Sequence, residues 1–200
     1  TAATVVSNLG NPSSDSLPVC WIDFGIFYQG YFRASSFTTG SSETELNSVT
    51  VSMENAPFPS DGFEVSVYDD SGYGPGSLLA SLTGTDNPAT AGAYTYTAGS
   101  PLALTANTTY FVVASVPQSG VVQRNFYWSY TETNSVTSAE GWTIGNYSWL
   151  SDTGGASWML NNIFGTSAGQ FSVDTTVVPE PSTALLLVGG LSGLLLRRRK

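Results

Sequence analysis

The sequence predicts an all-β protein, an antiparallel β-sandwich or jelly roll, followed by a single C-terminal transmembrane helix. In several short stretches apolar and polar residues alternate with a period of two, which is typical of strands with one buried face. Clusters of Gly, Pro, Asn and Asp separate these stretches. Residues 183–196 carry no charge and precede four consecutive cations at the end of the chain. We therefore expect a strand-rich domain and then a membrane segment.

The alternation is clearest in two stretches. Their apolar positions, which we expect to face the core, are Val49, Val51 and Met53 in the first and Phe63, Val65 and Val67 in the second. Residues 108–116 are instead apolar on both parities, which favours a central strand covered on both sides. The short strands and Gly-rich connectors favour antiparallel pairing over βαβ units.

Composition changes along the chain suggest four segments. We expect a poorly ordered leader at 1–19, the β-sandwich domain at 20–176, a linker at 177–182, and the helix with its basic tail at 183–200.

Residues 142–149, WTIGNYSW, predict a β-hairpin. A Gly-Asn pair is a favoured two-residue turn, so residues 145 and 146 would form the turn. Since alternate residues of a strand share a face, one face of this hairpin would carry Trp142, Ile144, Tyr147 and Trp149.

The aromatic residues of the last third of the chain have two interpretations. They form part of the core, because the opposite face of the hairpin is polar. Alternatively, they are exposed and stack against sugar rings, and the candidates for this role are Trp142, Tyr147, Trp149 and Trp158.

The charge distribution excludes one class of partner. Fourteen of the 15 acidic residues but only two of the six basic residues precede residue 179, so residues 1–178 carry a formal charge of −12. Binding to nucleic acid requires Lys and Arg contacts to phosphate, so we expect no nucleic-acid partner. The loop around Asp69 and Asp70 could hold a structural Ca²⁺, but it lacks a recognised calcium-loop spacing. We assign no metal ligand and no cofactor.

The sequence assigns no catalytic residue. It contains no histidine, and its one cysteine, Cys20, lies in an apolar stretch that is typical of a buried position. A glycoside hydrolase would need two converging carboxylates, and no local motif singles out a pair.

The C-terminal segment has the composition of a short membrane anchor. As a helix its 14 uncharged residues would span about 21 Å, against about 30 Å of hydrocarbon. Cations resist translocation, so Arg197, Arg198, Arg199 and Lys200 would stay cytoplasmic with the domain outside. A buried C-terminal helix is the alternative, but four adjacent cations have no suitable place on an acidic β domain.

This segment resembles a PEP-CTERM sorting signal. The resemblance rests on Pro179, Glu180 and Pro181, then the apolar segment, then the basic terminus, all in order. It implies recognition by an exosortase, an integral-membrane cysteine protease, with membrane anchoring before cleavage near the motif. It also implies release or transfer to the cell surface, in company with exopolysaccharide and biofilm systems.

Residues 20–176 are similar to extracellular β-sandwich domains of the choice-anchor R type. The similarity rests on the Pro75-Gly76 loop after an alternating strand, the YTYT and TTYFVV stretches, and a Trp-rich end. No catalytic residue follows from it.

Together these observations predict an exported, non-enzymatic structural or adhesive protein of the cell surface or matrix, associated with exopolysaccharide or biofilm. The alternative is a polysaccharide-binding module that uses exposed Trp and Tyr. A glycoside-active enzyme is the third interpretation.

Overall fold

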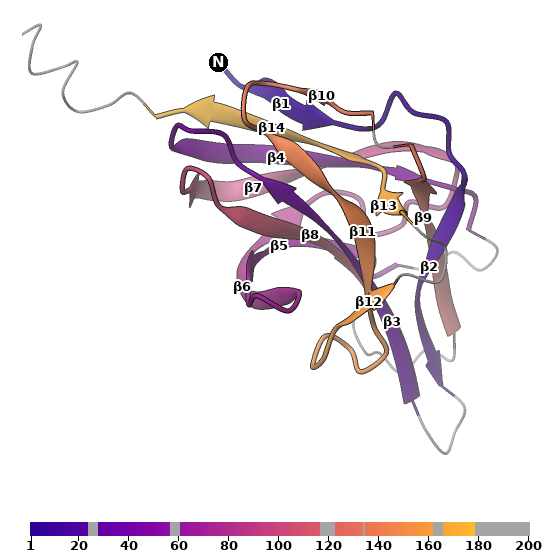
Figure 1. Ribbon diagram of the computed structural model, residues 1–200. Coiled ribbons are helices and arrows are strands. Elements are labelled where there is room, and N and C mark those ends of the chain that lie inside the picture. Colours follow the sequence, from indigo (N-terminus) through magenta and orange to yellow (C-terminus); the bar gives the residue numbers. More distant parts are fainter. Residues whose placement is uncertain (24–27, 57–60, 117–122, 134, 162–165, 179–200) are drawn as a thin grey trace, which may run out of the picture.

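The computed structural model describes residues 1–23, 28–56, 61–116, 123–133, 135–161 and 166–178. Every regular element among these residues is a β-strand (Figure 1). The strands are β1 Ala3–Ser7, β2 Asp15–Asp23, β3 Tyr28–Thr38, β4 Thr44–Met53, β5 Glu64–Asp70, β6 Pro75–Thr83, β7 Gly92–Leu104, β8 Thr109–Ser115, β9 Gln123–Thr131, β10 Thr137–Ser138, β11 Thr143–Ser151, β12 Met159–Asn161, β13 Ala168–Gly169 and β14 Phe171–Val177.

The strands form one continuous sheet in the order β10-β1-β14-β4-β7-β6-β5-β8-β3-β2-β9-β13, with β11 and β12 added beside β3. The ladders between these strands are all antiparallel, as expected. A bridge between Met53 of β4 and Trp128 of β9 closes the eight strands from β4 round to β9 into a ring. The predicted all-β antiparallel class is confirmed, but its strands belong to one curled sheet and not to two separate sheets.

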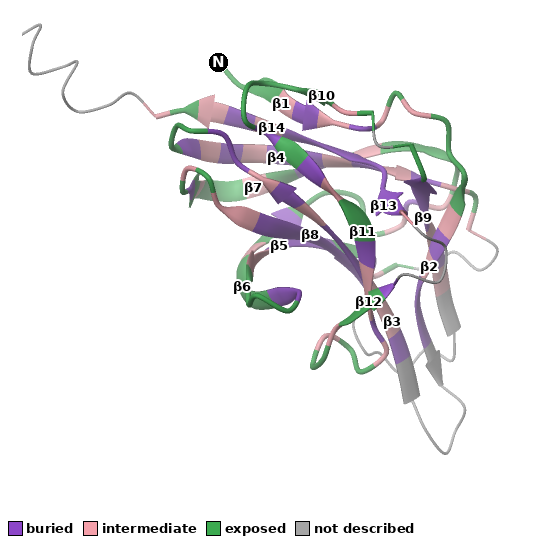
Figure 2. Ribbon diagram, in the orientation of Figure 1, coloured by how far each residue is buried: buried purple, intermediate pink, exposed green. Residues whose placement is uncertain are grey.

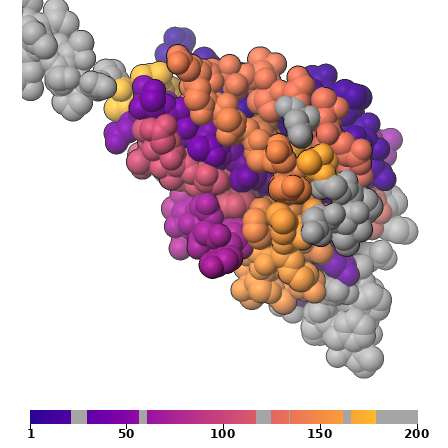
Figure 3. Space-filling view, in the orientation of Figure 1, coloured from indigo at the N-terminus to yellow at the C-terminus, as the bar shows by residue number. Residues whose placement is uncertain are grey.

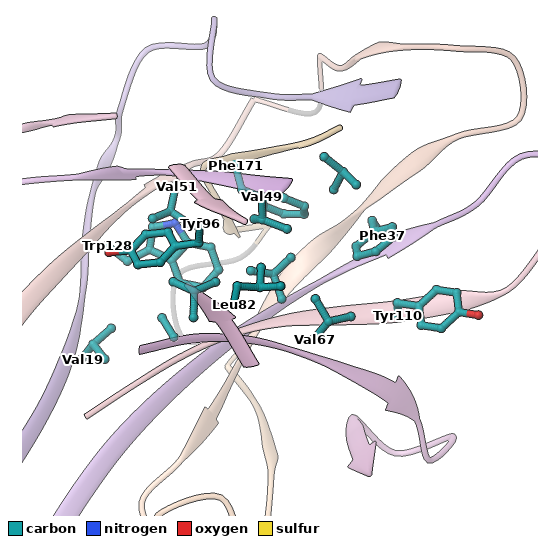
Figure 4. Close-up of a cluster of buried hydrophobic side chains, with 14 of the residues drawn as sticks. Val19, Phe37, Val49, Val51, Val67, Leu82, Tyr96, Tyr110, Trp128 and Phe171 are labelled. Carbon is teal, nitrogen blue, oxygen red and sulfur yellow. The ribbon is translucent and has the colours of Figure 1, made fainter. Parts of the chain in front are cut away.

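The core lies inside this curled sheet. Phe37 of β3 and Phe171 of β14, two strands that do not pair, have ring centroids 6.4 Å apart. Figure 4 shows the side chains of β4 and β14 facing those of β5 and β8 across the interior. Trp128 lies fully buried among them.

The alternation in the sequence correctly identified the buried faces. Val49 and Val51 of β4 and Val65 and Val67 of β5 are fully buried. Strand β8 is buried on both of its faces. Val112 belongs to the main core, and Phe111 belongs to a smaller cluster on the outer face of the sheet. Figure 2 shows how burial concentrates in β4, β8 and β14, while β6 is mostly exposed.

The N-terminal residues form part of the sheet, although a poorly ordered leader was expected at 1–19. Strand β1 pairs with β14, and Val6, opposite Val173, is fully buried. Asn8 fixes the turn after β1: its Nδ2 donates to the Gly169 carbonyl (3.0 Å), and its Oδ1 accepts from the Phe171 amide (2.7 Å). Strand β2 then begins at Asp15.

The predicted hairpin at 142–149 is wrong, because β11 is a single strand. Ile144 pairs with Phe37 and Ser148 pairs with Ser35, so three residues of β11 lie opposite Ser36 alone. One edge of β3 pairs with β2 only as far as Tyr31, and β11 covers the rest of that edge. Residues 145–147 therefore form a bulge in a long-range ladder. Glycine is needed at position 145, because a side chain there would collide with the Ser36 hydroxyl.

The linker motif and the expected C-terminal helix, residues 179–200, lie outside the described residues. Within the described part of the chain, no helix has the length and apolar character needed to cross a membrane.

Candidate functional site

A surface pocket of about 240 Å³ lies on the outer face of β3, β8 and β11, against the loop that joins β5 to β6. We call it the aromatic pocket. In Figure 3 the surfaces of β6 and of β11–β12 lie side by side in this region. The lining residues that bear on its chemistry are Ser36, Asp70, Thr109, Asn146, Tyr147 and Trp149.

Phe111 and Trp149 line the aromatic pocket and belong to a small apolar cluster on the outer face of the sheet. Its buried members are Ala34, Phe111 and Val113, and Trp149 and Trp158 pack against them. The Trp149 indole meets Phe111 edge-on, with ring centroids 6.0 Å apart and planes at 87°. This packing holds Trp149 in place as a rigid, partly exposed surface.

The bulge in β11 supplies the exposed side of the pocket. Because three residues oppose Ser36, Asn146 and Tyr147 project to the surface, and the Tyr147 side chain is 41% exposed. After the bulge, Ser148 is buried and Trp149 lies on the outer face. The irregularity thus places an exposed phenol ring and a partly exposed indole at one pocket.

The loop after β5 forms the opposite wall. Asp70 Oδ1 accepts a hydrogen bond from the Gly72 amide (2.7 Å), and Ser71 Oγ donates to the Gly74 carbonyl (2.8 Å). Gly74 has a φ of 109°, and a Cβ atom there would lie 2.8 Å from the Trp149 ring. Only glycine lets this loop rest on the indole in that conformation.

The polar groups at the pocket can exchange hydrogen bonds with an uncharged ligand. Hydroxyls come from Ser36, Thr109 and Tyr147, an amide from Asn146 and a carboxylate from Asp70. Thr109 Oγ1 lies 3.0 Å from Thr38 Oγ1, so the two hydroxyls share a hydrogen bond. No Lys or Arg is among the described residues that line this pocket.

The structure separates the four candidate stacking residues. Tyr147 and Trp149 line the aromatic pocket, whereas Trp158 is partly buried in the cluster beneath it. Trp142 is a core residue, stacked on Phe37 with centroids 6.2 Å apart. Sequence reasoning missed Ser36 and Thr109, which no local pattern distinguishes from ordinary strand residues.

The Asp69–Asp70 loop uses its carboxylates in backbone turns. Asp69 Oδ1 accepts from the Ser77 amide at 2.5 Å, and Asp70 accepts from Gly72 as described. In the parts of the chain that the structure describes, no three His, Cys, Asp or Glu residues are grouped as metal ligands would be. The suggested structural Ca²⁺ therefore has no further support.

Cys20 is buried on β2, beside Arg33. Burial raises the pKa of the Cys20 thiol to about 11, although Tyr31 and Arg33 oppose the shift. Burial also lowers the pKa of the Arg33 guanidinium to about 10. A thiol with a pKa this high carries almost no thiolate at neutral pH, so Cys20 is no nucleophile there.

The Cys20 thiol is expected to resist modification in the folded protein. At pH 8 a pKa near 11 leaves about a hundredfold less thiolate than an ordinary thiol pKa near 9 does. The reaction of DTNB with native protein should therefore be at least about a hundredfold slower than with urea-unfolded protein, as followed at 412 nm. Comparable rates in the two states would show that Cys20 is accessible and ionised.

The same shift predicts a pH dependence of stability. The folded-state pKa of Cys20 is raised, so the folded protein favours the neutral thiol. The stability that depends on this neutral thiol is fully present below the unfolded-state pKa, near 9, and is lost as pH rises toward 11. Between pH 9 and 10 the free energy of unfolding should fall more steeply for the native sequence than for Cys20→Ala. Equal slopes for the two proteins would contradict the raised pKa.

Comparison with known proteins identifies the C-terminal segment. Residues 177–200 match the PEP-CTERM protein-sorting motif. No curated protein matches the chain. The resemblance of residues 20–176 to choice-anchor R domains has no support from a matching relative.

The fold and the motif together define a class. The described part of the chain is all-β, and the C-terminal segment carries a PEP-CTERM signal, which exosortases process. The motif indicates export to the cell envelope or the extracellular space, with membrane anchoring before processing.

Proposed function

We propose that this protein is a non-enzymatic adhesive component of the cell surface or extracellular matrix, and that it binds exopolysaccharide through the aromatic pocket. The observation that carries the proposal is the placement of Tyr147 and Trp149 in one pocket beside hydroxyl, amide and carboxylate groups. Aromatic faces pack against the apolar faces of sugar rings, and the surrounding polar groups match sugar hydroxyls. A few directed polar groups around an apolar surface are typical of ligand sites.

Three features support a binding role over catalysis. The chain contains no histidine, and its one thiol is buried and protonated. Glycoside hydrolysis requires two carboxyl groups at the scissile bond; Asp70 is the one carboxylate among the described residues lining the aromatic pocket, and the neighbouring Asp69 carboxylate is engaged by the Ser77 amide.

The sorting signal supplies the setting for this role. Export places the acidic domain outside the membrane, where extracellular polysaccharide is the abundant polymer of a biofilm. Contact with the membrane is transient in this proposal: the apolar segment holds the chain until exosortase acts near Pro179, Glu180 and Pro181, with the four terminal cations inside.

Replacement of Tyr147 with Ala tests the binding role. The exposed ring is lost without disturbing the core, so the affinity for exopolysaccharide isolated from the producing cells should fall by about tenfold or more. Retardation in native gels that contain the polymer measures the affinity, and gel filtration of the recovered polymer checks that it is not cleaved. Tyr73→Ala is the matched control, because Tyr73 is 87% exposed but lines no described pocket. Equal losses in the two variants, or none in Tyr147→Ala, would contradict the proposal.

A further inference from the structure

A second pocket opens where β6 and β7 separate. The two strands pair only at Leu82–Ala98 and Thr83–Thr97, and the earlier part of β6 turns away from β7 (Figure 1). The space between them, about 470 Å³, has walls that include Asp69, Asp70, Leu79, Leu102, Ala103 and Thr109. We call it the gap pocket. Leu79 is 39% exposed there, so apolar surface remains in contact with solvent.

The two pockets have a common wall. Asp70 and Thr109 line both the aromatic pocket and the gap pocket. Their chain neighbours Asp69 and Tyr110 pair with each other, since β5 and β8 are hydrogen-bonded side by side. The two pockets therefore adjoin at Asp70 and Thr109, and we call the surface from Tyr147 past these residues to Ala103 the groove.

The far wall of the groove is fixed before any ligand arrives. The Thr108 amide donates to Thr39 Oγ1 (2.9 Å), which in turn donates to the Thr105 carbonyl (2.7 Å). The Asn107 amide donates to the Gly40 carbonyl (2.9 Å). A preformed wall reduces the ordering cost of binding.

We propose that this groove binds an internal stretch of an uncharged polysaccharide, with one sugar on Tyr147 and the following sugars running past Asp70 into the gap pocket. The inference rests on the proposed function and extends it to the class and length of the ligand. At about 240 Å³ the aromatic pocket is smaller than the roughly 300–1,000 Å³ of typical ligand sites, so it suits only part of a ligand. The gap pocket provides the space for the rest.

The charge of the groove selects the class of polymer. Its walls hold the carboxylates of Asp69 and Asp70, and no Lys or Arg is among the described residues that line it. Residues 1–178 as a whole carry a formal charge of −12, as counted above. A polyuronate or sulfated chain would be repelled, whereas the apolar surfaces of Leu79, Leu102 and Ala103 suit the faces of neutral sugars.

Affinity as a function of chain length tests the groove. The probes are neutral oligosaccharides of two to eight units prepared from the polymer that the protein binds, measured by calorimetry with the full chain. We expect affinity to rise by about tenfold or more from the shortest to the longest oligomer. Ala103→Trp fills the gap pocket and should remove this rise without changing the binding of the shortest oligomers. Ala93→Trp, at an exposed position of the same strand outside both pockets, should behave like the native protein.

The outcomes separate the two proposals. If native affinity does not increase with length, or if Ala103→Trp weakens all lengths equally, the groove is wrong while the aromatic pocket stands. Equal affinity for a polyuronate of matched length would overturn the assignment to uncharged polymers. Failure of every oligomer and of the polymer to bind would overturn the proposed function itself.

Discussion

Truncation of the chain after Val178 is expected to move the protein from the cell envelope to the culture medium. The truncation removes the PEP-CTERM signal except its first two residues, together with the apolar segment and the cations that resist translocation. Without that segment the exported domain loses the membrane anchoring that the motif implies before exosortase acts. Immunoblots of cell, membrane and medium fractions should show most of the truncated protein in the medium.

The truncated protein is a fair test because its fold should be intact. Strand β14 ends at Val177, and its ladders with β1 and β4 lie entirely within the retained residues. The thermal unfolding midpoint of the purified domain should therefore match that of the full chain. An unchanged distribution between fractions would contradict the anchoring step. Mature protein that retains its Arg-Arg-Arg-Lys end in mass spectra would contradict processing.

The strand faces could be predicted because their determinants are local. Burial of one face imposes a period of two, so Val49 and Val51 pointed to the core without knowledge of their partners. Residues 108–116 likewise indicated a strand covered on both faces, which β8 confirms.

The N-terminal strand and the bulge in β11 could not be predicted because their determinants are distant in sequence. Strand β1 is stabilised by β14, more than 160 residues further along the chain, through contacts such as Asn8 with Phe171. The Gly145-Asn146 pair suits both a tight turn and a bulge. The bulge forms because the edge of β3 beyond its pairing with β2 is free to pair with residues on both sides of 145–147. Local propensity favoured the turn, but the long-range ladder determined the structure.

The candidate site was predictable only in part for the same reason. Sequence composition singled out Tyr147 and Trp149, but it grouped them with Trp142, which lies on the opposite face of the sheet because no turn separates it from Trp149. The polar wall comes from β3, β5 and β8 and is assembled by the order of strands. Ser36 and Thr109 carry no local sign of that role.

Replacement of Trp128 with Ala is expected to cost about 3–5 kcal/mol of unfolding free energy, a large share of the roughly 5–15 kcal/mol of a typical domain. The Trp128 ring is fully buried beside Phe171, with centroids 6.3 Å apart. Its Nε1 donates to the Gln170 carbonyl (2.9 Å), which the substitution leaves without this partner. Trp128 also bridges to Met53, where the ring of strands closes. Urea denaturation followed by circular dichroism measures the loss.

Two further variants separate the contributions at this position. Trp128→Phe keeps most of the apolar volume but removes the hydrogen bond, so its cost should be about 1–3 kcal/mol. Trp158→Ala removes an equally large side chain from the partly buried outer cluster and should cost less than Trp128→Ala, since less surface is buried there. If Trp158→Ala proved the more damaging of the two alanine variants, the main stabilising core would lie on the outer face of the sheet and not within the ring closed by Met53 and Trp128.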